Sequence, residues 1–181
     1  MSYVLKQRTE TADYTIGDES RGPAIKSEYD IAKPAMDFIA PSSSFFFAPE
    51  PQKSSFMVYL PSKNVADSLL NHYWLAVHPV SRVVHRPTFQ RQWDSFWHQV
   101  HSGMEPLASL QALVMGTLMS AVISLSDQAI SMQLGVPKVQ LLRSFQQGAE
   151  SALCRANFLR TTKFQTLQAL VMYLVSLSAR G

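Results

Sequence analysis

Histidine and cysteine are the side chains of this sequence best suited to chemistry, but their spacing offers little. His98 and His101 lie three residues apart, so they would share one face of a helix and could in principle contact one metal ion. The surrounding sequence does not complete a familiar metal-binding motif, and His72, His78 and His85 are spaced by six and seven residues. We therefore interpret the histidines as structural residues.

Motifs for catalysis are also missing from the sequence. It contains no glycine-rich phosphate loop and no Gly-x-Ser-x-Gly nucleophile turn. The single cysteine, Cys154, excludes a disulfide framework and a cysteine-ligated zinc cluster, and we expect it to be a small buried hydrophobe on a helix. The sequence assigns no catalytic, cofactor-binding or metal-ligating residue, and we predict that the protein is not an enzyme.

The stretch His78–Phe89, HPVSRVVHRPTF, must position the elements around it. The residue before a proline is driven out of the α-helical region, so Pro79 and Pro87 predict the end of one helix, an extended passage and a new helix. We expect the first helix at 62–77, capped by Ser62, and the second from the N-cap Thr88. The first helix should face inward with Val65, Leu69, Tyr73, Ala76 and Val77, and the second with Phe89, Trp93, Phe96, Trp97 and Val100.

The segment 106–126 carries no charged residue and is long enough to span a membrane, yet its many serine and threonine residues favour a buried central helix that opens with Pro106. Gly116 predicts a close helix contact there.

After a polar stretch, 127–138, we expect a helix over 139–158 and another from Phe164, capped by Thr161 or Thr162. Their inward residues should be Val139, Leu142, Phe145, Ala149, Leu153 and Ala156, then Leu167, Leu170, Val171, Leu174 and Leu177.

The sequence therefore predicts an all-α protein, a bundle or array of about five helices preceded by a largely disordered N-terminal arm. The hexapeptide LQALVM occurs at 110–115 and again at 167–172, which suggests two helices with equivalent central packing. We place the arm at 1–56, where five prolines interrupt any periodicity, and the helical domain at 57–181. Within the arm, Ser42–Phe47 predicts either a strand or loop folded back on the body, or a docking motif.

Charge argues against a nucleic-acid-binding surface. The net charge is +3, and Arg82, Arg86 and Arg91 form the one tight basic group in the body of the chain. No apolar segment of signal-peptide length follows the start of the chain, so we do not expect secretion.

Two sets of residues resemble a known family. The first is the stretch 60–97, above all His78, Pro79, His85, Arg86, Pro87, Thr88 and Phe89, and the second is Phe158, Leu159 and Arg160 followed by an LQAL helix. Both resemble the fungal-specific transcription factor domain, which is the regulatory middle region of fungal zinc-cluster transcription factors. The resemblance covers about two thirds of the chain, lacks the zinc-cluster DNA-binding head and stops before the family's helical domain ends.

The resemblance implies a nuclear regulator of transcription, for example of a metabolic gene cluster. It implies a protein partner, in a homodimer or a heterodimer with a related regulator, and allows a small-molecule effector. Because the cysteine cluster is missing, we expect no sequence-specific DNA binding by this chain alone, and we expect no membrane association. An enzyme or accessory protein built on a borrowed helical scaffold, and an inactive truncated product, are the alternatives.

Overall fold

The computed structural model describes residues 55–179, which all belong to one compact unit. These residues form six α-helices and two short helical segments and contain no strand, so the predicted all-α class is confirmed. The polar stretch 127–138 supplies a helix that was not expected. The predicted arm lies outside the described residues except for its last two positions, and Ser42–Phe47 lies wholly outside them.

The described chain begins with the short helix η1 (Phe56–Tyr59), followed by α3 (Lys63–His72) and the π-helical turn η2 (Tyr73–Val77). Ser62 precedes α3 as predicted, although its side chain makes no capping bond. In η2 the His78 N–H donates to the Tyr73 carbonyl over 2.9 Å. This wider turn changes the helical phase, so Ala76, expected to face inward, is exposed.

Helix α4 (Arg86–His101) begins two residues before the predicted cap Thr88. His85 is its N-cap residue, with extended backbone angles of φ −84° and ψ 113°. Pro87 lies in the first turn of the helix, where its missing N–H would have had no intrahelical acceptor. The predicted aromatic face is confirmed, because Phe89, Trp93, Phe96 and Trp97 are all buried.

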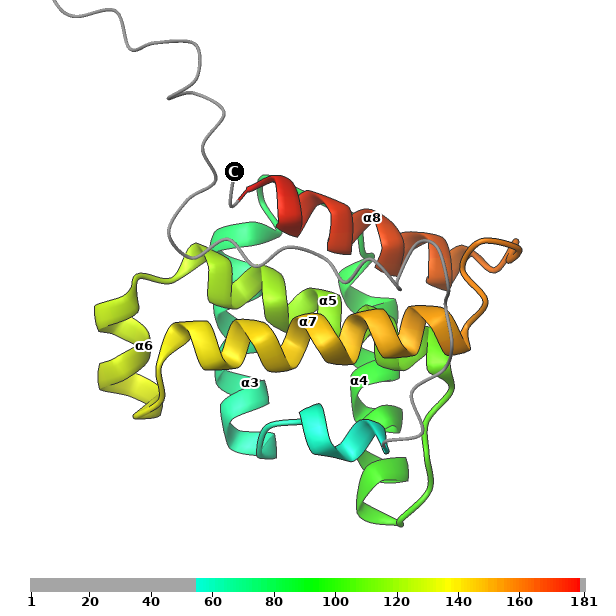
Figure 1. Cartoon of the computed structure of the whole chain (residues 1–181), viewed down its shortest axis with the longest axis horizontal. Coiled ribbons are helices and arrows are strands. Elements are labelled where there is room, and N and C mark those ends of the chain that lie inside the picture. Colours follow the sequence, from blue (N-terminus) through cyan, green and yellow to red (C-terminus); the bar gives the residue numbers. More distant parts are fainter. Residues whose placement is uncertain (1–54, 180–181) are drawn as a thin grey trace, which may run out of the picture. The chain divides into compact units, whose positions relative to one another are not determined.

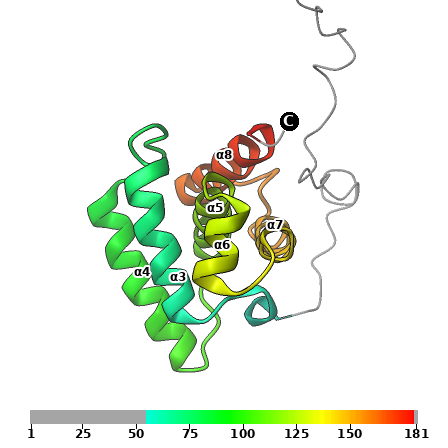
Figure 2. The same cartoon turned by 90° about the vertical axis from the view of Figure 1, so that its left-hand side faces the viewer.

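Helix α5 (Ala108–Ser124) is the buried centre of the unit. It packs against α3, η2 and α4 on one side and against α7 and α8 on the other, as Figures 1 and 2 show together. It starts after Pro106 rather than with it, because Leu107 is the N-cap residue. No single helix within 55–179 is long and apolar enough to cross a membrane, while α5 and α6 together would meet that test but are bent by 115°.

Three helices complete the unit: α6 (Asp127–Leu134), α7 (Lys138–Arg155) and α8 (Phe164–Ser178). The Ser126 hydroxyl caps α6 by accepting the Ala129 N–H at 3.2 Å. Burial along α7 begins only at Leu142, so Val139, in the first turn, is 37% exposed instead of facing inward.

The orientation of α8 differs from the prediction. Its buried face consists of Thr166, Ala169, Met172, Tyr173 and Ser176. These allow a close approach to α5, where a Cβ at Gly116 would lie 3.3 Å from the Met172 Cβ, so the predicted close contact of Gly116 is confirmed. Leu167, Val171 and Leu174 consequently face outward, with exposures of 41%, 47% and 45%.

The two copies of the LQALVM hexapeptide therefore do not pack equivalently in their helices, so the prediction of equivalent central packing is wrong. Its first copy is buried throughout on α5, whereas in the second copy Leu167 and Val171 are exposed on α8. The difference arises because α5 has neighbours on opposite sides and α8 lies at the outside of the packed helices (Figure 2).

Candidate functional site

The corner between η2 and α4, residues 78–89, is fixed by aromatic contacts centred on Trp74. The Trp74 ring meets His78 edge-on at 4.9 Å and Phe89 at 5.8 Å between centroids. The Arg86 guanidinium lies 5.3 Å from the centroid of the same ring, within cation–π range. The two ends of the corner are thus held together through one side chain of η2.

Charge and burial act together on His78. Partial burial, and then the positive charges of Arg82 and Arg86, hold its pKa below the usual value for histidine. The imidazole is therefore neutral at pH 7. At the other end of the corner, His85 Nδ1 and Thr88 Oγ1 share a hydrogen bond of 2.9 Å across the first turn of α4. The contacts of these two histidines therefore stabilise the path of the backbone at the two ends of the corner.

The second signature sequence lies in the link between α7 and α8. Phe158 is buried at 6% exposure, whereas Leu159 and Arg160 are exposed. The corner and the C-terminal part of the chain meet through α8 instead, where Gln168 Nε2 donates to the Val83 carbonyl at 2.7 Å. Among the signature residues, Phe89 and Phe158 pack in the core. Most of the other signature residues remain accessible at the surface.

Five exposed apolar residues form a continuous stripe on α8, which we call the α8 outer face. Its members lie at steps of three, four, three and one residues: Phe164, Leu167, Val171, Leu174 and Val175. Each is at least 41% exposed. Scattered apolar residues are common on protein surfaces, but a contiguous apolar stripe is typical of a binding surface. The opposite side of the helix is buried and carries Thr166, Ala169, Met172, Tyr173 and Ser176.

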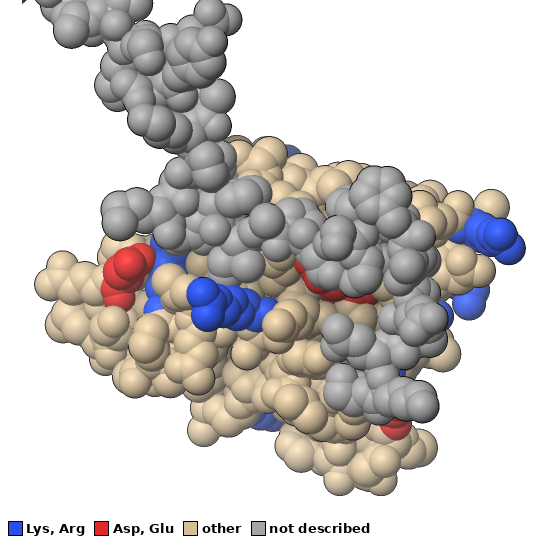
Figure 3. Space-filling view, in the orientation of Figure 1, with Lys and Arg blue, Asp and Glu red and all other residues tan. Residues whose placement is uncertain are grey.

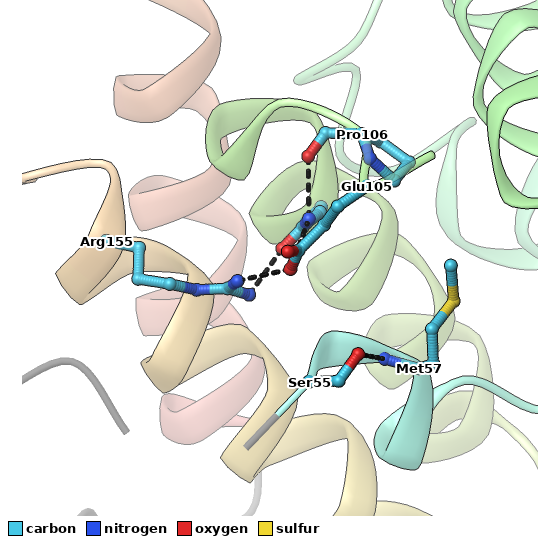
Figure 4. Close-up of polar contacts among 6 residues, drawn as sticks. Ser55, Met57, Glu105, Pro106 and Arg155 are labelled. Carbon is cyan, nitrogen blue, oxygen red and sulfur yellow. Dashed lines mark hydrogen bonds and ion pairs between the residues drawn. The ribbon is translucent and has the colours of Figure 1, made fainter. Parts of the chain in front are cut away.

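A polar cluster that the sequence did not reveal links the start of α5 to the end of α7 (Figure 4). Arg155 donates one hydrogen bond to Glu105 and another to Gln111, and Gln111 Nε2 donates to the Pro106 carbonyl at 2.6 Å. The hydrogen bond from Arg155 holds the Glu105 pKa below its usual range, against the opposing effect of burial. Its partners are about fifty residues apart in sequence, so no local pattern could predict it. The cluster holds the start of α5 against the end of α7, and we call it the clamp.

The histidine pair that shares one face of α4 lies at the surface. His98 and His101 are exposed, and within 55–179 no three His, Cys, Asp or Glu side chains are close enough to hold an ion. Cys154 is half-buried against the core, and burial followed by the charge of Glu150 raises the pKa of its thiol. A thiol of this kind is a poor nucleophile at neutral pH.

On the face shown in Figure 3, the lysine and arginine side chains of the described residues occur in separate small groups. Among the predicted trio, Arg86 lies against Trp74, and Arg91 lines a cleft of about 410 Å³ beside α5 and α8.

A further cleft lies between η2, the start of the corner, α5 and α8, and we call it the η2–α8 cleft. It has a volume of about 250 Å³ and mostly apolar walls. Five of its lining residues are polar: Tyr73, Ser81, Ser120, Ser124 and Ser176.

The chain is similar to fungal regulators of transcription. It is 31% identical over 131 residues to an uncharacterized transcriptional regulatory protein of Schizosaccharomyces pombe, covering 72% of this chain and 20% of the relative. It is 28% identical over 164 residues to the aurofusarin cluster transcription factor of Gibberella zeae, covering 90% and 24%. It is 30% identical over 173 residues to a pyriculol/pyriculariol biosynthesis cluster transcription factor of Pyricularia oryzae, covering 92% and 23%.

These alignments relate the chain to one part of larger proteins, since it spans about a fifth to a quarter of the length of these relatives. C6 finger transcription factors of Aspergillus species also match about 60% of the chain. No family model matches the chain. No solved structure matches it either. The chain is thus related to fungal transcription factors, and none of the relatives named here is an enzyme.

Proposed function

We propose that this chain regulates transcription in the nucleus through contacts with other proteins, as a counterpart of the middle region of fungal zinc-cluster factors. The similarity to fungal transcription factors over as much as 92% of the chain carries this proposal. The accessible signature residues and the all-helical unit agree with it. The control of a metabolic gene cluster belongs to the same proposal, because two of the relatives are named for such clusters.

Protein contacts are the favoured mechanism because the chain offers an apolar surface and lacks the means to hold a zinc cluster. A cysteine-ligated cluster needs several thiolates, and the sequence contains one cysteine. The α8 outer face presents five apolar side chains that water solvates poorly. A related regulator with an apolar helix of its own, or a second copy of this chain, is the partner that this face fits. A small-molecule effector would bind to the same helical unit.

A tethering experiment tests this function. The full chain fused to an unrelated DNA-binding domain should change the output of a reporter gene that carries the matching site. Leu167→Glu with Leu174→Glu places two charges on the α8 outer face and should abolish the change. Leu75→Glu with Met132→Glu, at positions that are 81% and 80% exposed, is the matched control and should retain it.

The outcomes separate the function from the surface. A tethered wild-type chain with no effect on the reporter would overturn the regulatory function. A full effect from the α8 variant would leave regulation standing and overturn the choice of surface. Sedimentation velocity of the purified chain and of both variants shows whether the partner is a second copy, and a fluorescent fusion reports nuclear location.

A further inference from the structure

The α8 outer face is an uncharged stripe that runs along a whole helix. Helix α8 has 15 residues, so it is about 22 Å long, and no residue from Phe164 to Ser178 carries a charge at neutral pH. The five apolar residues of the face are spaced mainly by three and four residues, and an apolar stripe on a second helix can match this spacing. A helical segment is therefore the occupant that the surface favours.

The sequence on both sides of α8 is basic. Residues 151–181 include four arginine and lysine residues and no aspartate or glutamate. Arg160 and Lys163, in the link before α8, are exposed and belong to none of the ion pairs within 55–179. Figure 3 shows basic side chains at the right-hand edge of the view, where Figure 1 places this link. The start of the α8 outer face thus lies beside positive charge that is not neutralised by an ion pair.

Helix α4 adds a third basic residue near the same end of α8. Arg91 is exposed and lines the cleft of about 410 Å³ together with Gln165, in the first turn of α8. A neighbouring cleft of about 340 Å³ shares Gln165 with it and includes Phe164 of the outer face. Arg91 also forms no ion pair within the described residues. Basic residues of two separate elements therefore lie near the start of the outer face.

This charge disfavours a second copy of the chain as the occupant. In a parallel contact between two α8 helices, the Lys163 side chains of both copies would lie at the same end. In an antiparallel contact, Lys163 of one copy would lie near the end of α8 in the other, where Arg180 is the next charged residue of the sequence. Both arrangements place like charges near each other, and like-charge contacts suppress the wrong partner. A complementary partner carries acidic residues.

We propose that the α8 outer face binds an amphipathic helix of a different protein, with an apolar stripe against α8 and with aspartate or glutamate residues near Arg91, Arg160 and Lys163. Burial of the apolar stripe supplies most of the affinity, whereas the charges select the partner and speed its association. This inference rests on the proposed function, because it names the class of partner for the surface assigned there.

Three synthetic peptides with the length of α8, 15 residues, test the proposal on the purified full chain. The acidic peptide carries leucine at helical steps of three and four and glutamate at the flanking positions. The basic peptide has lysine in place of every glutamate, and the rearranged peptide has the composition of the acidic one in an order that breaks the stripe. Fluorescence anisotropy at about 50 mM salt should show the acidic peptide binding at least about tenfold more tightly than either of the others.

Variants of the chain assign the binding to this surface. Lys163→Glu should weaken binding of the acidic peptide about threefold, and Arg160→Glu with Lys163→Glu about tenfold, because each change replaces an attraction by a repulsion. Lys63→Glu is the matched control on α3, which packs on the other side of α5, and should alter the affinity less than about twofold. Leu167→Glu with Leu174→Glu should abolish the binding. Circular dichroism checks that each variant is folded.

The proposal is overturned if the acidic peptide does not bind, if the basic peptide binds as tightly, or if the folded Arg160→Glu and Lys163→Glu variant keeps the wild-type affinity. Sedimentation velocity adds a further test. Self-association of the full chain that is lost with Leu167→Glu and Leu174→Glu would place a second copy on the face and overturn the proposal. A chain that regulates the tethered reporter but fails these titrations would keep the proposed regulatory function and lose the acidic partner.

Discussion

Phe89 shows why the corner motif is a packing motif. Its side chain is 1% exposed and lies between Trp74, at 5.8 Å, and Trp93, at 6.1 Å. It therefore couples η2 to α4 through consecutive ring contacts. Pro87, two residues earlier, is exposed and acts on the backbone, because it fixes the first turn of the helix.

Substitution of these two residues tests the organising role of the corner. Phe89→Ala should lower the free energy of unfolding by roughly 3 to 5 kcal/mol, since it removes a fully packed ring. Pro87→Ala alone should cost about 1 kcal/mol or less, because it mainly restores freedom to the unfolded chain. Urea unfolding followed by far-UV circular dichroism measures both changes.

His98→Ala, an exposed change on the same helix, is the control and should stay within about 0.5 kcal/mol of the wild type. If the Pro87→Ala and Phe89→Ala double variant unfolds at the wild-type midpoint, the corner is peripheral to stability.

At the scale of elements, close approach between helices explains what the apolar pattern missed. Gly148 on α7 lies so near η1 that an added Cβ would come within 2.9 Å of the Tyr59 Cβ and 3.2 Å of the Met115 Cε. Gly116 on α5 is less crowded, with its nearest neighbour at 3.3 Å. Both glycines lie in the middle of a helix. A difference in stability between their alanine variants therefore reflects packing and not helix propensity.

Alanine substitution should therefore rank the two helix contacts. Alanine is favoured over glycine in a helix by about 1 kcal/mol, whereas overpacking costs about 1–3 kcal/mol. Gly148→Ala should be clearly destabilising, because the Tyr59 Cβ cannot yield without moving η1. Gly116→Ala should be close to neutral. Thermal unfolding of the two variants decides the order, and the reverse ranking would contradict these helix contacts.

Periodicity and proline positions predicted most of the element order, but not every boundary or face. The helix at 62–77 and the helix from Phe164 lie where the sequence placed them. Thr88 is a favourable N-cap type, but the helix already begins at Arg86, with His85 as the N-cap and Pro87 in the first turn. The orientation of α8 places Met172 and the Ala169 backbone against Gly116 of α5, a contact between helices that the apolar pattern of α8 alone does not specify.

The candidate site was less predictable than the fold. The corner residues follow from the resemblance, yet the η2–α8 cleft and the Arg155 cluster join residues far apart in the chain. Tyr73 was expected to face inward and does so.

At the scale of the whole molecule, the arrangement around α5 ties the corner, the clamp and the outer face into one unit. Helix α5 contacts α3, η2, α4, α7 and α8, so a displacement of any of these helices changes the packing around α5. The clamp of Glu105, Gln111 and Arg155 fixes the entry to α5 against the end of α7. A packed unit of this kind transmits strain between surfaces instead of absorbing it.

The distribution of charge over the molecule leads to the prediction for DNA. Affinity for a duplex requires several phosphate contacts from a concentrated basic surface. The net charge of the chain is only +3, and its basic residues are scattered on the face shown in Figure 3. Arg86 is partly engaged with Trp74, which reduces what the corner offers to phosphate.

We therefore expect no sequence-specific DNA binding by the purified chain. Any weak association should disappear between about 50 and 200 mM salt, because it would consist of counterion release alone. Fluorescence anisotropy over several unrelated duplexes at both salt concentrations measures this, with a basic DNA-binding domain as the positive control. Binding that survives 200 mM salt and differs between duplexes would require a DNA-reading surface and would replace protein contact as the means of regulation.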